Sequence, residues 1–179
     1  MIQIYTGNGK GKTTSAFGLA MRASGQGYKV IIFQFLKPKK LVCGEETAAK
    51  KIRNIKIVKF KQIHPIFVAP VSMLKAQREI KKSMQKAILE VKKAIFGKKY
   101  NVVILDEIIN IIDQGFSRKK EFIGLIKKAP GNVELVLTGR GDISEIEPYA
   151  DYVTIMIDKK HPFRQYVNAR RGMNPTPCG

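Results

Sequence analysis

Tryptophan is absent from the 179 residues, and cysteine and histidine occur only twice each. Cys43 and Cys178 are far apart and form no Cys-x-x-Cys pair, so we expect two reduced, unpaired thiols. His64 and His161 are too few and too widely separated to suggest a zinc site by spacing. Aromatic residues make up only 8% of the chain, so no platform for stacking nucleobases is evident.

Long apolar runs are also missing, and none approaches the ~20 residues that a membrane-spanning helix needs. The first residues read as a strand and lack the basic and apolar segments of a signal peptide. We therefore expect a cytoplasmic protein without a membrane partner. The length predicts a single α/β domain over residues 1–173, followed by a short proline-containing tail at 174–179.

Acidic residues are scarce, with 14 Asp and Glu against 33 Lys and Arg, which gives a net charge of +19. Between Lys37 and Lys99 there are 18 basic and 4 acidic residues, so 14 charges of the excess lie in that stretch. Such a surface attracts polyanions, among which nucleic acid is the usual one. The simpler interpretation is a solvated lysine face, as in some thermophilic proteins. We do not expect nucleic acid as a partner.

Short apolar runs rich in Val and Ile alternate with helical patterns along the chain. The runs are Ile2–Tyr5, Lys29–Phe35, Ile55–Phe60, Asn101–Leu105, Glu134–Thr138 and Tyr152–Ile157. Most are apolar without strict alternation, which is typical of parallel strands buried on both faces. The clearest helices are 13–26 and 73–96, the second with a stripe of Ile80, Met84, Ile88, Val91 and Ile95. Ser144–Glu147 resembles a capping box that opens a short helix. The pattern predicts an α/β fold, a mainly parallel sheet with helices on both faces.

A glycine-rich turn between the first strand and the first helix predicts a phosphate-binding loop. Its glycines let backbone N–H groups turn toward phosphate oxygens at the positive end of the following helix. Lys12 would bridge the phosphates, and the Thr13 hydroxyl would help to hold Mg²⁺. In the usual pattern, G-x-x-x-x-G-K-[ST], the first glycine lies five residues before the second. Here the second is Gly11, the residue five places before it is Thr6, and the first glycine is Gly7. The expected ATP-binding residues are Gly7, Asn8, Gly9, Lys10, Gly11, Lys12, Thr13 and Thr14.

Two later strands end in charged residues at the same predicted edge of the sheet. The run 102–107 ends in Asp106 and Glu107, which predicts a magnesium ligand at Asp106 and a group that orders water or ligand at Glu107. A helix-capping role is the alternative for this carboxylate pair. Arg140 follows the next strand and could neutralise a polyphosphate, or could be an ordinary surface arginine. Together with Lys12, these three residues are the expected catalytic residues.

A protein nucleophile is not evident, because no Ser-His-Asp or Cys-His arrangement is visible in the sequence. A mechanism whose nucleophile comes from a second substrate would fit that absence.

Five motifs in this order resemble the cob(I)alamin (corrinoid) ATP adenosyltransferases of the phosphate-loop, RecA-like type. They are Thr-Gly-Asn-Gly-Lys-Gly-Lys-Thr-Thr (6–14), Gln-Phe-Leu-Lys (34–37), Leu-Asp-Glu-Ile (105–108), Leu-Thr-Gly-Arg (137–140) and Lys-His-Pro-Phe…Ala-Arg-Arg-Gly (160–172). The resemblance covers almost the entire chain, and the late first glycine is itself typical of that family.

The resemblance implies an enzyme that transfers the 5′-deoxyadenosyl group of ATP to the Co(I) of a corrinoid and releases triphosphate. Gly7–Thr13 would hold the triphosphate, Thr13 and Asp106 would bind Mg²⁺, and the tail with His161 and Phe163 would close over nucleotide or corrinoid. It also implies a RecA-like P-loop fold, a homodimer, and a reductase that supplies Co(I).

One segment departs from the family pattern. The family usually carries Gly-Phe-Thr-Trp before the long helix, whereas this chain reads His-Pro-Ile-Phe-Val-Ala-Pro at 64–70. Phe67 is expected to replace one of the aromatic side chains on the corrinoid side. The alternatives to an adenosyltransferase are a RecA-like ATPase stimulated by nucleic acid and a non-catalytic carrier of nucleotide or corrinoid.

Overall fold

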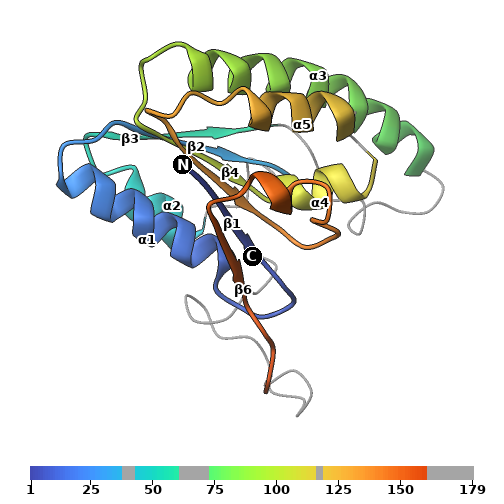
Figure 1. Cartoon of the computed structure of the whole chain (residues 1–179), viewed down its shortest axis with the longest axis horizontal. Helices are drawn as coiled ribbons and strands as arrows, with labels where there is room; N and C mark the ends of the chain where they lie inside the picture. The colour runs from blue at the N-terminus through green and yellow to red at the C-terminus, as the bar shows by residue number, and fades with distance from the viewer. Residues whose placement is uncertain (38–42, 61–72, 116–118, 161–179) are drawn as a thin grey trace.

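The computed structural model describes residues 1–37, 43–60, 73–115 and 119–160. They form a six-stranded, all-parallel sheet with the order β3-β2-β4-β5-β1-β6 (Figure 1). The strands are β1 (Ile2–Thr6), β2 (Val30–Gln34), β3 (Ile55–Lys59), β4 (Val102–Asp106), β5 (Glu134–Thr138) and β6 (Tyr152–Ile155). Each predicted strand is confirmed to within two residues at either end.

Helices cover both faces of the sheet, as predicted (Figure 1). The α-helices are α1 (Lys12–Gly25), α2 (Gly44–Ala49), α3 (Met73–Phe96), α4 (Ile108–Asp113) and α5 (Lys119–Lys127), and a 3₁₀ helix, η3, covers Glu147–Tyr149. Among the described residues, no helix is long and apolar enough to cross a membrane.

Alternate residues of each central strand enter two different cores. In β4, Val103 and Leu105 pack with α3, α4 and α5, whereas Val102 and Ile104 pack with α1 and α2. Both cores are built from fully buried aliphatic side chains, because every central strand is sandwiched between helices. On α3, the predicted stripe is confirmed at Met84, Ile88, Val91 and Ile95, which are at most 8% exposed. The side chain of Ile80 lies outside the described part of the chain.

Edge strand β6 does not follow the expectation of strands buried on both faces. It pairs with β1 alone among the described strands, and Tyr152 and Ile155 are more than half exposed. A strand at the border of a sheet lacks the second neighbour and the helical cover that bury the central strands.

Three local expectations are wrong. Ser144 does not cap a helix, because the 3₁₀ helix begins only at Glu147 and has Ile146 at its N-cap; the Ser144 N–H and hydroxyl instead donate to the Asp142 carboxylate. The basic stretch 38–46 reads in the sequence as a less regular segment, but α2 begins at Gly44, supported by an ion pair of 2.8 Å from Lys50 Nζ to the buried Glu46. Cys43, just before α2, is disulfide-bonded rather than a reduced thiol.

The order of the strands determines which loops meet. Because all strands are parallel, the segments after β1, β2, β4 and β5 leave the sheet at one edge, which we call the carboxyl edge. β5 lies between β1 and β4, so the phosphate loop and Asp106 are separated by one strand.

Candidate functional site

The loop between β1 and α1 has the backbone conformation that its glycines allow. Gly7 and Gly11 have φ angles of 97° and 117°, in the left-handed region that favours glycine. The N–H of Gly9 donates to the carbonyl of Met156 at 2.7 Å, and the N–H of Met156 donates to Thr6 at 2.8 Å. The loop is therefore fixed against the segment that follows β6.

Close packing against Met156 gives the first testable prediction, for Gly9→Ala. A Cβ on Gly9 would lie 2.7 Å from the Met156 carbonyl oxygen and 2.8 Å from two backbone carbons, so the loop or the backbone after β6 must shift. We expect a loss of about 1–3 kcal/mol in stability and a tenfold or greater loss of ATP affinity, measured by thermal unfolding and calorimetry.

Gly18→Ala is the matched control, because Gly18 lies exposed on α1 with nothing within 4 Å of its added Cβ. This change is expected to raise stability by about 0.5–1 kcal/mol and to leave ATP affinity unchanged. Equal effects of the two alanines would contradict the packing argument.

Lys12 begins α1 and is only 7% exposed. Its ammonium donates to the Gly7 carbonyl at 2.5 Å and to the Gly9 carbonyl at 2.8 Å. Burial, followed by the charge of Arg140, lowers the pKa of Lys12, and Glu107 opposes the shift. The ammonium thus lies inside the loop at the first turn of α1, where an anionic ligand would relieve both effects.

Asp106, at the end of β4, is fully buried and is surrounded by four side chains that donate hydrogen bonds to it. Its Oδ1 accepts from the Thr13 and Thr138 hydroxyls, both at 2.8 Å. Its Oδ2 accepts from the Lys37 ammonium at 2.6 Å and from the Gln34 amide at 3.3 Å. These five residues, from four different segments of the carboxyl edge, are called the Asp106 cluster below.

The structure therefore brings Thr13 and Asp106 together as predicted, and it adds three residues that the sequence reasoning did not select. Gln34, Lys37 and Thr138 had been noted only as members of motifs, and Thr138 also as the end of a predicted strand. Their position in the sequence could have pointed to them, because all three lie at or just after the carboxyl end of a strand that flanks β4.

Charge pairing dominates the ionisation of the cluster. Burial alone would raise the pKa of Asp106, but the charge and hydrogen bond of Lys37, with the two threonine hydroxyls, hold that pKa below its usual value. Burial alone would lower the pKa of Lys37, but the Asp106 carboxylate raises it. The carboxylate and the ammonium therefore stabilise each other as ions.

Glu107 has a strained backbone, with φ of 66° in a non-glycine residue. Its N–H donates to the Thr138 hydroxyl at 3.0 Å. Although Glu107 occupies the N-cap position of α4, its side chain makes no capping hydrogen bond. Burial and the neighbouring Asp106 charge raise the pKa of Glu107, against the attraction of Lys37, Lys12 and Arg140. The helix-capping alternative is therefore wrong for this side chain, which lies among the charges of the site.

Arg140 follows β5 in a turn that α4 holds in place. The Arg140 N–H donates to the Asn110 amide oxygen at 2.7 Å, and Gly139, with φ of 145°, packs too closely on Asn110 and Ile109 to carry a Cβ. One guanidinium N–H of Arg140 donates to the carbonyl of Asn8 at 3.3 Å. Arg140 therefore lies against the phosphate loop, where the sequence predicted it.

The structure says less about the other predicted site residues. The Thr14 hydroxyl is 3.4 Å from Glu45 Oε1 on α2, and Lys10 is exposed on the loop. Phe67, His161 and Phe163, expected on the corrinoid side, lie outside the described residues.

The donor set of Thr13 and Asp106 fits a magnesium ion that is bound together with a nucleotide. Among the described residues no group of three or more acidic, histidine or cysteine side chains could hold a metal alone. Mg²⁺ is commonly bound through one or two carboxylates, substrate phosphates and water. In addition, the buried amide oxygen of Gln34 has no hydrogen-bond donor within the described part of the chain, as expected of an acceptor that awaits a ligand or its water.

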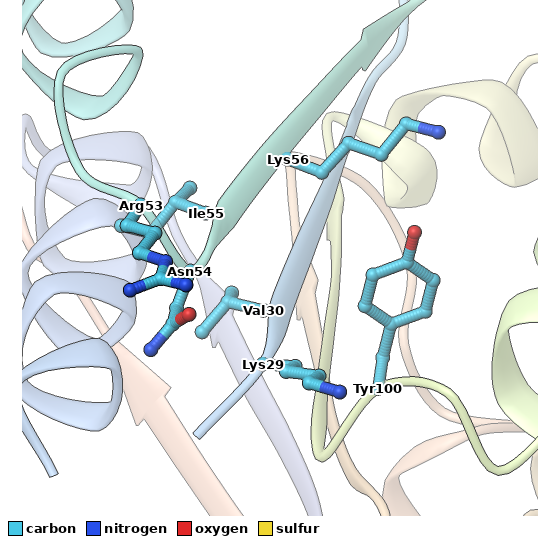
Figure 2. A pocket seen from close by; sticks show the side chains of 7 residues that line it. All are labelled: Lys29, Val30, Arg53, Asn54, Ile55, Lys56 and Tyr100. Carbon is cyan, nitrogen blue, oxygen red and sulfur yellow. The ribbon is translucent and has the colours of Figure 1, made fainter. Parts of the chain in front are cut away.

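A cavity of about 180 Å³ lies far from this site, at the opposite edge of the sheet (Figure 2). Lys29, Arg53, Lys56 and Tyr100 line it together with the starts of β2 and β3. Figure 2 shows Arg53 and Lys56 pointing away from each other, so their charges do not converge on one ligand.

A family model described as ATP:corrinoid adenosyltransferase BtuR/CobO/CobP matches residues 1–174. The chain belongs to this adenosyltransferase family. Two curated relatives are the corrinoid adenosyltransferase CobA of Salmonella typhimurium and the corrinoid adenosyltransferase of Escherichia coli. Each is 30% identical, over 97% of this chain and 85% of the relative.

A solved structure also supports the RecA-like fold predicted for this adenosyltransferase-family chain. A KaiC-like protein from the hyperthermophilic archaeon Pyrococcus horikoshii matches 89% of this chain and 72% of its own, with a TM-score of 0.51. At 18% identity, this likeness concerns the fold alone.

Proposed function

We propose that the protein transfers the 5′-deoxyadenosyl group of ATP to the Co(I) of a corrinoid. The electron pair of Co(I) forms the bond to the 5′ carbon of ribose, the bond between that carbon and its oxygen breaks, and the oxygen leaves with triphosphate. Family membership over residues 1–174 carries this proposal. The alternatives, an ATPase stimulated by nucleic acid and a non-catalytic carrier, have no comparable support.

The cations of the carboxyl edge suit a reaction whose leaving group is a whole triphosphate. The Lys12 ammonium lies inside the phosphate loop, and Arg140 contacts the same loop by a hydrogen bond to the Asn8 carbonyl. Fixed positive charge stabilises the charge that develops on the leaving oxygen, because the protein groups need no reorganisation during the reaction. Glu107 would order water or ligand beside this charge, and residues 7–13 would hold the phosphates with their N–H groups, except that of Gly9, which donates to Met156.

Magnesium would be held by Thr13 and Asp106, with phosphate oxygens and water completing its coordination. When bound, it supplies further neutralisation of the triphosphate. Asp106 would accept this ion through a carboxylate that Thr138 already orients with a hydrogen bond of 2.8 Å.

The corrinoid side of the proposal rests on residues outside the described ranges. Phe67, His161 and Phe163 are proposed to contact the corrinoid. A reductase that supplies Co(I) and a homodimeric assembly complete the proposal, without nucleic acid as a partner.

Product analysis tests the proposed function. The protein is incubated with ATP, Mg²⁺ and a chemically reduced cobalamin, and the phosphates and corrinoids are separated by chromatography. We expect equal amounts of triphosphate and adenosylated corrinoid, and no triphosphate when the reductant is omitted. ADP and orthophosphate formed faster with DNA or RNA would contradict the proposal, and tight binding without turnover would indicate a carrier.

A further inference from the structure

Lys37 contacts both side chains of the proposed metal site, Asp106 and Thr13. Its ammonium is 2.6 Å from Asp106 Oδ2 and 3.5 Å from the Thr13 hydroxyl oxygen. The side chain is 21% exposed, whereas that of Asp106 is fully buried. One protein cation therefore already touches the two side chains that we assign to magnesium.

The backbone at Leu36, the residue before Lys37, is strained where it turns the Lys37 side chain toward Asp106. Leu36 has a φ of 54° and is 4% exposed, so a buried leucine is held in the left-handed region. Such conformations cost about 1–3 kcal/mol and persist only where the surrounding structure imposes them. The turn after β2 is thus built to return Lys37 to Asp106.

An ammonium and a divalent cation bound directly to this carboxylate would repel each other. Mg²⁺ binds oxygen at about 2.0–2.1 Å, so an ion on Asp106 would lie only a few ångströms from the present ammonium. Conversely, Asp106 without any cation would be a buried, uncompensated charge, which is strongly unfavourable. The carboxylate therefore needs one cation at a time.

We propose that the Lys37 ammonium is a displaceable occupant of the magnesium site, which keeps divalent cations off Asp106 until one arrives with a triphosphate. On binding, Lys37 leaves Asp106 and becomes a counter-charge to the triphosphate. The inference rests on the proposed function and adds a triphosphate-binding residue to it.

Two neighbouring groups support the exchange. The buried Gln34 amide already donates to Asp106 Oδ2, and its amide oxygen lacks a donor among the described residues, so a metal-bound water could supply one. The carboxylates of Glu45 and Glu107 also attract the Lys37 ammonium where it now lies.

Manganese binding to the nucleotide-free protein tests the proposal, with Mn²⁺ as a paramagnetic substitute for Mg²⁺. Free Mn²⁺ is measured by electron paramagnetic resonance in the wild type, Lys37→Met and Lys37→Arg. We expect weak binding to the wild type and to Lys37→Arg, and binding at least about tenfold tighter to Lys37→Met, because its carboxylate has no other cation. Lys50→Met is the matched control: it also loses one charge, but from the exposed end of the ion pair with Glu46, and should bind like the wild type.

Equal Mn²⁺ affinity of folded Lys37→Met and wild type would overturn the proposal. Should Lys37→Met fail to fold, the wild type provides a second measurement, the ¹⁵N-detected signal of the Lys37 ammonium, assigned by its loss in Lys37→Arg. This signal is expected to shift when ATP and Mg²⁺ are added together, and no shift at saturating ATP would overturn the exchange.

Neither measurement needs a corrinoid, so the inference and the proposed function fail separately. If triphosphate is the product but Lys37→Met binds Mn²⁺ no more tightly than the wild type, only the role of Lys37 is wrong. If ADP is the product but Lys37→Met binds Mn²⁺ more tightly than the wild type, only the proposed adenosyl transfer is wrong.

Discussion

Asp106→Asn is expected to lower adenosyl transfer at least about 100-fold and to destabilise the protein by about 3 kcal/mol. The amide retains one acceptor oxygen but cannot neutralise Lys37 or bind magnesium as a carboxylate does. The loss of stability falls at the lower end of the range for a broken buried ion pair, because Lys37 is 21% exposed and can turn toward water. Activity is measured as adenosylated product, and stability by urea unfolding.

The effect on stability should depend on pH in a defined direction. The pKa of Asp106 is lower in the folded protein than in the unfolded chain, so its contribution is complete above about pH 4, the usual Asp value, and is lost as the pH falls through the folded pKa. The difference in free energy of unfolding between wild type and Asp106→Asn should therefore shrink in acid. Asp142→Asn, at an exposed carboxylate, is the control and should cost far less at neutral pH.

Lys12→Ala is expected to weaken ATP binding by about 100-fold or more, measured by calorimetry with Mg²⁺ present. Lys12 is 7% exposed and its ammonium lies within the loop, so its attraction to a triphosphate is little screened by water. In the variant, the carbonyls of Gly7 and Gly9 lose their donor as well.

Lys10→Ala provides the comparison within the same loop, because Lys10 is exposed. We expect less than a tenfold loss of affinity, and a loss that disappears as salt is added, since surface charges are screened. Similar losses for both lysines would indicate that overall charge, rather than the buried position of Lys12, binds the nucleotide.

Most of the fold could be predicted from the sequence. Runs of Val and Ile on both faces indicate buried parallel strands, and strict helical periodicity identified α3 with its observed bounds. Short elements were harder to predict. Helix α2 has six residues, too few for a periodic pattern, and depends on the contacts of Glu46 with Lys50 and Lys59. The predicted capping box at Ser144 failed because the Asp142 carboxylate accepts the Ser144 N–H that the Glu147 carboxylate would accept in such a box.

For the site, the sequence by itself determined the residues whose chemical role can be inferred from the spacing of a short motif. Gly7 to Thr13, Asp106, Glu107 and Arg140 belong to short motifs, whose backbone or strand position can be inferred within a few residues. Their order along the chain also carries the resemblance to corrinoid adenosyltransferases, which the match over residues 1–174 supports.

Only the tertiary structure decided that Gln34, Lys37 and Thr138 surround Asp106. These residues are 32 to 72 positions away from it in sequence, and only the order β2-β4-β5 brings them together at the carboxyl edge. The ion pair between Lys37 and Asp106 also depends on the left-handed turn at Leu36, which the core imposes against the local preference of leucine. A charge balance of this kind has no sequence signature, because it arises from burial and distance, which exist only in the folded chain.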